Sequence, residues 1–193
     1  MHAGPDKALE RLIVLIADSN PHSRRITRMM LANVGARVGY GVSDGPAALN
    51  AIRELNPDVM ILDWNLPGLS APDIMRIMRS PGSFPKANLP VIVLTDSAER
   101  ARVDLALQLG VHEFLVKPTS PKTLQQRLIG IANNPRPMVL AGGYYVPLPR
   151  KRVDREELIS APSNRQQTDL DSDQEPIRHS EANDMVPGLG ADR

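Results

Sequence analysis

A chain of 193 residues is long enough for one domain of ordinary size and an appended segment. Its net charge of +1 argues against bulk electrostatic attraction to DNA or anionic lipid, and the absence of cysteine excludes disulfides, thiolate metal sites and thiol chemistry. No secretion-signal pattern opens the sequence and no apolar run is long enough for a membrane span, so we expect a cytoplasmic protein with no membrane insertion.

The predicted elements begin with the apolar run 12–17, which is typical of a strand covered on both faces. Asn20 and Pro21 then supply the cap and the first turn of a helix. A weak strand at 38–42 follows, and Ser43 is placed to cap a second helix. The apolar side chains that recur at helical spacing in the first helix predict its buried face: Ile26, Met29, Met30 and Val34.

The rest of the first two thirds of the chain repeats this alternation. Strands are predicted at 59–62, 91–94 and 113–116, and a helical pattern follows each of them. Thr119 or Ser120 caps the last helix. Five strands alternating with five helices predict an α/β fold, an open parallel sheet covered by helices on both faces.

Four of the five apolar runs lead directly into a polar residue that could serve a functional site at the sheet edge. These residues are Asp18, Asp63, Thr95 and Lys117, after the first, third, fourth and fifth runs. In an open α/β sheet, sites form beyond the carboxyl ends of the strands, where the strand order switches. We therefore expect the four side chains to converge, which would offset the free-energy cost of an ionised Asp63 at the end of a buried strand.

Such a cluster has a defined chemistry. Two carboxylates with neighbouring oxygens suit a hard cation, above all Mg²⁺, which keeps several water ligands. A carboxylate beside bound Mg²⁺ can attack phosphorus and form an aspartyl-phosphate. Lys117 would then pair with phosphoryl oxygens, and the Thr95 hydroxyl would donate a hydrogen bond to one of them.

The motifs LIADSNPHSRR, ILDWNLPG, VLT and FLVKP, in this order and spacing, resemble the receiver domain of bacterial two-component response regulators. The DWN-x-P run is most similar to stand-alone chemotaxis receivers. The resemblance covers residues 10–133 and leaves 1–9 as an N-terminal extension. It implies a flavodoxin-like, doubly wound five-stranded parallel sheet in the order 2-1-3-4-5.

The resemblance implies that Asp63 accepts a phosphoryl group from the phosphohistidine of a sensor histidine kinase or a phosphotransfer protein. Mg²⁺ would be held by Asp18, Asp63 and the backbone carbonyl of Asn65. The switch and phosphate-contacting residues would be Thr95, Phe114 and Lys117. Output would be contact with a downstream protein, such as a motility or relay component, through the face made by the fourth helix, the fifth strand and the fifth helix. The chain would be a signalling domain and not an enzyme, with slow autodephosphorylation at most.

The chain departs from the family pattern at three positions. The family usually has two adjacent acids after the first strand, whereas Ser19 follows Asp18 here, so metal ligation by Ser19 would be weak or through water. The residue after the switch threonine is usually small, and here it is Asp96. Its carboxylate would either repel a phosphoryl group or cap the next helix, and we expect it to cap. Phe114 replaces the commoner tyrosine, which is a mild change.

These departures leave a second function open, namely a pseudo-receiver adaptor that binds partners without phosphorylation. A hydrolase of similar topology with Asp63 as nucleophile is disfavoured, because Asn65 stands where such enzymes keep their general acid. An amide cannot transfer protons in that role.

Residues 134–193 are too polar and too proline-rich for a second core, and we expect them to be mostly disordered, basic first and then acidic. No helix-turn-helix or winged-helix pattern occurs, so DNA is not an expected partner. The segment allows three interpretations: a solvated charge run, a site for a small nucleotide such as cyclic di-GMP, or a stretch around 144–148 that folds back onto the domain or docks a partner. The residues of the possible ligand site are Tyr144, Tyr145, Arg150, Lys151, Arg152 and Arg155.

Overall fold

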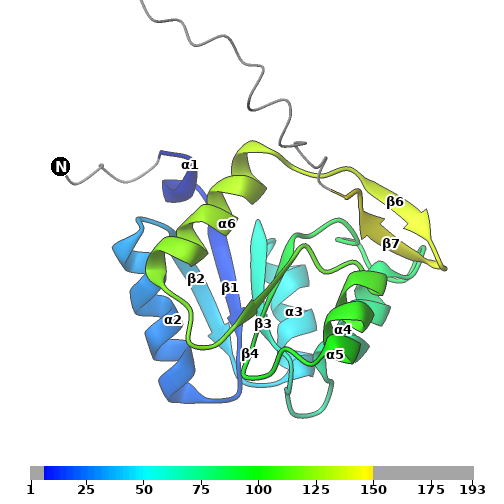
Figure 1. Cartoon of the computed structure of the whole chain (residues 1–193), viewed down its shortest axis with the longest axis horizontal. Helices are drawn as coiled ribbons and strands as arrows, with labels where there is room; N and C mark the ends of the chain where they lie inside the picture. Colours follow the sequence, from blue (N-terminus) through cyan, green and yellow to red (C-terminus); the bar gives the residue numbers. More distant parts are fainter. Residues whose placement is uncertain (1–6, 150–193) are drawn as a thin grey trace, which may run out of the picture. The chain divides into compact units, whose positions relative to one another are not determined.

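The computed structural model describes residues 7–149, which lie within one compact unit of the chain. Its main feature is a five-stranded parallel sheet with the strand order β2-β1-β3-β4-β5 (Figure 1). This order confirms the predicted flavodoxin-like fold. The strands are β1 (Ile13–Ala17), β2 (Arg37–Val42), β3 (Val59–Asp63), β4 (Val91–Thr95) and β5 (Glu113–Val116).

Helices cover both faces of the sheet, and residues 7–149 hold one more helix than the sequence predicted. The additional helix is α1, a single turn whose Leu9 is fully buried; four residues are too few for a helical period to be recognised in the sequence. The helices are α1 (Lys7–Glu10), α2 (Pro21–Asn33), α3 (Gly45–Leu55), α4 (Ala71–Arg79), α5 (Arg100–Gln108) and α6 (Pro121–Asn133).

The alternation of side chains along each strand divides the core into two layers. One layer joins Leu15 and Met60 of the sheet to the buried faces of α3, α4 and α5. The other joins Ile16 and Ile61 to α1, α2 and α6 (Figure 1). This arrangement leaves the carboxyl ends of the strands free to carry a site.

The buried face of α2 differs from the prediction. Met30 and Val34 are buried, but Ile26 and Met29 are 44% and 57% exposed. Thr27 and Leu31 take their places in the core, because the stripe that faces the sheet is turned by one residue. A threonine was not counted as a core residue in the sequence pattern, although its methyl group can pack there.

Helix starts follow the expected capping chemistry with one correction. Asn20 caps α2 and Ser120 caps α6, each through its side chain. Ser43 was predicted to cap α3, but Asp44 does so by accepting a hydrogen bond of 2.8 Å from the Ala47 amide. The helix begins one residue later than predicted, and a carboxylate at this position is an equally good cap. None of the helices within residues 7–149 has the length and apolar character needed to cross a membrane.

Part of the segment expected to be mostly disordered is an antiparallel hairpin, β6 (Met138–Ala141) and β7 (Tyr144–Pro147). Gly142 and Gly143 form its turn, both with positive φ, as a hairpin turn of type I′ requires. The hairpin lies beside α4 and α5 (Figure 1). Its Tyr144 packs against the core layer that these helices share. For Tyr144, the structure therefore agrees with the interpretation that this stretch folds back onto the domain.

Candidate functional site

Backbone pairing brings three strand ends to one edge of the sheet. Asp18 follows β1, and its amide donates to the Val42 carbonyl, which continues the pairing with β2. Asp63 is the last residue of β3 and lies opposite Leu94 of β4. Lys117 follows β5, and its amide donates to the Thr95 carbonyl at 2.7 Å. The side chains at these strand ends therefore share one rim.

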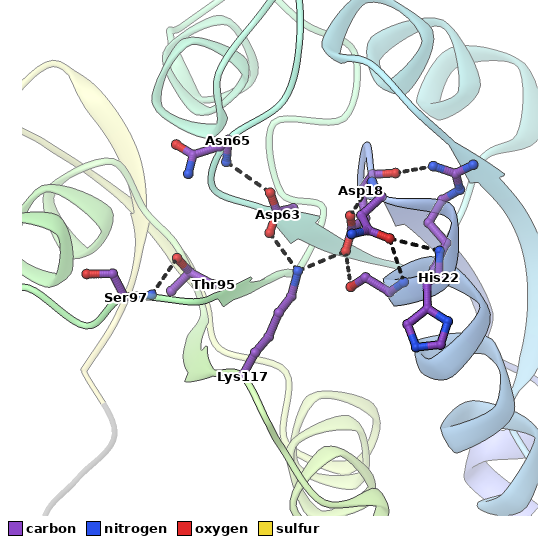
Figure 2. Close-up of polar contacts among 10 residues, drawn as sticks. Asp18, His22, Asp63, Asn65, Thr95, Ser97 and Lys117 are labelled. Carbon is purple, nitrogen blue, oxygen red and sulfur yellow. Dashed lines mark hydrogen bonds and ion pairs between the residues drawn. The ribbon is translucent and has the colours of Figure 1, made fainter.

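At the centre of this rim, one ammonium group bridges two carboxylates. Lys117 Nζ lies 2.9 Å from Asp18 Oδ2 and 2.8 Å from Asp63 Oδ1 (Figure 2). The three side chains are only 17%, 6% and 12% exposed, so water screens their interaction weakly. The bridge leaves a single net negative charge, which suits a site that receives a further cation.

Asp18 is also held by residues that the sequence analysis did not predict to be part of the site. Ser23 Oγ donates to Asp18 Oδ2 at 2.5 Å, and the Asn20 amide donates to Oδ1 at 2.9 Å. Arg24 donates to the Asp18 backbone carbonyl at 2.5 Å. Ser23 and Arg24 lie in the first turn of α2, so the Asn20 cap that starts this helix also points them at Asp18.

Ionisation of these groups is opposed by burial and favoured by their partners. Burial alone would raise the pKa of Asp18, but hydrogen bonds from Ser23, Lys117 and the Asn20 amide hold that pKa below its usual value. Burial would likewise lower the pKa of Lys117, but hydrogen bonds to Asp63 and Asp18 raise it. Asp18 and Lys117 are therefore both charged at neutral pH.

The lowered pKa of Asp18 makes stability depend on pH in acid. A carboxyl group whose pKa is lower in the folded protein than in the unfolded chain stabilises the folded protein. This stabilisation is fully present at pH values above 3.8, the pKa in the unfolded chain, and it is lost as the pH falls through the pKa of the folded protein. We expect the free energy of unfolding to fall more steeply below this value in the wild type than in Asp18→Asn. Urea unfolding at a series of pH values, followed by the fluorescence of Trp64, measures the free energy of unfolding of both proteins. Parallel plots of this free energy against pH for the wild type and Asp18→Asn would contradict the prediction.

The side chains of Asn65 and Thr95 lie at the same rim (Figure 2), but within the described residues neither hydrogen-bonds to the Lys117 ammonium group, and Phe114 lies within β5. The Asn65 amide donates to Asp63 Oδ2 at 3.1 Å, and Thr95 Oγ1 accepts a hydrogen bond from the Ser97 amide at 3.3 Å (Figure 2). Phe114 is half-buried and packs edge to face on Trp64, with ring centroids 6.1 Å apart. Their roles in switching stay predictions.

Asp96 does not cap a helix, and this prediction was wrong. Helix α5 starts at Arg100, four residues later, and the residue at its cap, Glu99, makes no side-chain capping bond. The Asp96 carboxylate has no hydrogen-bond or ion-pair partner within residues 7–149. Its side chain is exposed and lines the same cavity as Asp63 and Lys117.

The cavity over the bridge has a volume of about 520 Å³ and is open to solvent. Polar groups of Ser19, Asp63 and Asn65 line it, and Leu94, Met30 and Ile26 form an apolar side. A group the size of a phosphoryl could therefore reach Asp63 from solvent or from a docked protein.

The two carboxylates at this rim are suitable ligands for Mg²⁺. Asp18 and Asp63 are two carboxylates on one rim, and one or two protein carboxylates with water are what this ion usually takes. Across residues 7–149 no cluster of three or more acidic, histidine or cysteine side chains is arranged to hold a metal. The serine at position 19 therefore leaves Asp18 and Asp63 as the two carboxylates available to a divalent cation at this rim.

The possible ligand site of the C-terminal segment is only partly within the described structure. Tyr144 and Tyr145 are half-buried residues of β7 and do not line the cavity above Asp63. Arg150, Lys151, Arg152 and Arg155 lie outside the described residues.

Comparison with known proteins gives the same result for sequence and for structure. Residues 14–129 match the family model of the response regulator receiver domain. The chemotaxis protein CheY-3 of Vibrio cholerae is 31% identical over 115 residues, which are 60% of this chain and 87% of that protein. The DNA-binding response regulator MtrA of Mycolicibacterium smegmatis is 29% identical over 147 residues, which are 74% of this chain but only 62% of that protein.

Two solved receiver domains superimpose on this chain with a TM-score of 0.57. One belongs to the sensor histidine kinase PA1611 of Pseudomonas aeruginosa; it is 27% identical, covers 64% of this chain and 98% of its own, and has magnesium coordinated in its active-site cleft. The other is the signal receiver domain of NarL from Mycobacterium tuberculosis, 26% identical, with 64% and 97% coverage.

Proposed function

This chain belongs to the response regulator receiver domain family, and on that premise we propose that Asp63 is its phosphoryl acceptor. The observation that carries the proposal is the Lys117 bridge between Asp63 and Asp18 at the base of an open cavity. An ionised, partly buried carboxylate with an adjacent fixed cation is a nucleophile suited to phosphorus.

The transfer would form a bond from an Asp63 oxygen to phosphorus while the phosphorus–nitrogen bond of a phosphohistidine breaks. Lys117 would then neutralise the phosphoryl oxygens, since its ammonium group already contacts Asp63. Asp18, Asp63 and the backbone carbonyl of Asn65 would hold Mg²⁺. When bound, this ion would neutralise further negative charge on the phosphoryl oxygens.

Receiver domains interact with histidine kinases and with downstream targets. For this chain, we propose the face of α5, β5 and α6 as the output surface. The exposure of Val116 on β5 supports this proposal, because an apolar side chain that is 42% exposed is accessible to a partner protein. A sensor kinase or a phosphotransfer protein would dock on the side of the cavity.

Incubation with acetyl phosphate and Mg²⁺, read by intact mass, tests the proposal. We expect the wild type to gain the mass of one phosphoryl group and Asp63→Asn to gain none. A receiver domain of known reactivity is labelled in parallel as the control for the reagent. An unlabelled wild type beside a labelled control would rule out the phosphoacceptor function and support the pseudo-receiver, which the serine at position 19 and the acid at position 96 favour.

Removal of the Asp96 carboxylate should accelerate this labelling. Asp96 lines the cavity and has no ion-pair partner among the described residues 7–149, so its charge would repel an anionic donor. Two like charges about 4 Å apart in bulk water repel by about 1 kcal/mol, and for a cavity open to solvent this corresponds to a rate increase of about fivefold for Asp96→Ala at low salt. The increase should shrink as salt is added. Asp104→Asn on α5, which removes the same charge outside the cavity, is the matched control; equal rates for both variants would contradict the prediction.

A further inference from the structure

The β6–β7 hairpin packs against α4, against the end of α5 and against the turn into β5, which together form its seat. Tyr144 packs against the core layer together with Leu105 of α5, and Arg136 donates a hydrogen bond to the His112 carbonyl. The Tyr145 carbonyl lies so close to Gly110 that a side chain at position 110 would overlap this carbonyl oxygen. Gly110 also has a φ of +77°, which only glycine adopts readily. The turn is thus shaped to receive the hairpin.

The hairpin depends on this seat for its order. An isolated two-stranded hairpin is marginally stable at best in water, and each strand here has four residues. The side chains that point away from the seat bury little, since Leu140 remains 59% exposed. Elements with so few buried apolar contacts unfold locally at low free-energy cost. A small change in the contacts with α5 and Gly110 can therefore release the β6–β7 hairpin.

The loop that leads into the other end of α5 lies at the Asp63 site, where Asp96 lines the cavity. Thr95 ends β4 at the rim, and its hydroxyl accepts a hydrogen bond from the Ser97 amide in the loop that leads into α5. The helix is weakly held at this end, because its cap residue Glu99 makes no side-chain capping bond and Ala106 is the one residue of α5 that is fully buried. A movement of the loop 96–99 would therefore be transmitted along α5 to the hairpin.

We propose that the hairpin is a strap whose seating on α5 is coupled to the occupancy of Asp63. The inference rests on the proposed function: a phosphoryl group on Asp63 would take the Thr95 hydroxyl away from Ser97, α5 would shift, and the hairpin would leave its seat. The two events are linked in both directions, so a strap that is released also favours the occupied site.

Hydrogen exchange of the full chain, read by mass spectrometry, tests the mechanical link without phosphorylation. Tyr144→Ala removes the apolar anchor and Arg136→Gln removes the bond to His112, while Leu140→Ala on the outward side of the hairpin is the matched control. We expect the first two variants to exchange faster in the hairpin, in α5 and in the loop 96–99, and the control to resemble the wild type. Faster exchange confined to the hairpin in both variants would overturn the strap.

The second measurement compares the phosphorylated wild type with Asp63→Asn treated in the same way. Allosteric coupling typically changes an equilibrium by about fivefold or more, so we expect hairpin amides to exchange faster by at least this factor on phosphorylation. Intact mass reports the adduct in the same sample. An adduct with unchanged hairpin exchange would overturn the coupling. Absence of any adduct would instead overturn the proposed function, and the anchor variants would then decide whether the strap restrains α5.

Discussion

Replacement of Lys117 by Met is expected to slow phosphorylation of Asp63 by about a hundredfold or more, the usual cost of losing one preorganised group that stabilises charge in a transition state. Lys117 is the cation that contacts both carboxylates, at 2.9 and 2.8 Å. Without it, Asp18 and Asp63 face each other with no positive charge between them, and the incoming phosphoryl oxygens lose their partner. The initial rate of adduct formation with acetyl phosphate and Mg²⁺ measures the effect.

A matched variant separates this effect from a general loss of positive charge. Lys122→Met removes the same charge from an exposed position in the first turn of α6. We expect its labelling rate to stay close to that of the wild type. If Lys117→Met were labelled as fast as Lys122→Met, the bridge would have no part in phosphoryl transfer.

Replacement of Arg79 by Met should lower the free energy of unfolding by about 3 kcal/mol, because each buried carbonyl left without a donor costs about 1–3 kcal/mol. Arg79 is fully buried at the end of α4, and its guanidinium donates to the backbone carbonyls of Ala87, Leu89 and Gly110. Burial lowers the pKa of Arg79 to about 10, so the group is still charged at neutral pH. This one side chain ties α4 to the loop before β4 and to the seat of the hairpin.

Urea unfolding followed by the fluorescence of Trp64 measures this change. Arg76→Met is the control, since Arg76 lies one turn earlier on α4 and pairs with Asp73 at the surface. Exposed pairs of this kind contribute about 0–1 kcal/mol. Similar losses in the two variants would mean that the carbonyl contacts of Arg79 do not stabilise the fold.

The predicted elements came from properties of short stretches of chain. Apolar runs and helical periods placed the strands and helices, and turn chemistry set helix starts to within a residue at Asn20, Asp44 and Ser120. The strand order was implied by the resemblance of the motifs, and the polar residues at the strand ends pointed to one edge of a parallel sheet. The sequence therefore predicted all the residues on which the proposed phosphoacceptor site depends.

What could not be predicted depends on contacts between distant residues. Lys117 is 99 positions from Asp18 and 54 from Asp63, and no local pattern says that one ammonium group lies between two carboxylates. The carboxylate of Asp96 was expected to cap a helix, and only the late start of α5 left it in the cavity.

The sequence by itself determined the fold class, the edge of the sheet that carries the chemistry and the identity of the candidate acceptor, because strand and helix periods and the residues that end strands are local. The tertiary structure alone decided that Arg79 is a buried cation, that Ile26 and Met29 are exposed, and that the hairpin sits against Gly110. Each of these depends on which surfaces remain after the helices have packed, and packing is a property of the whole domain.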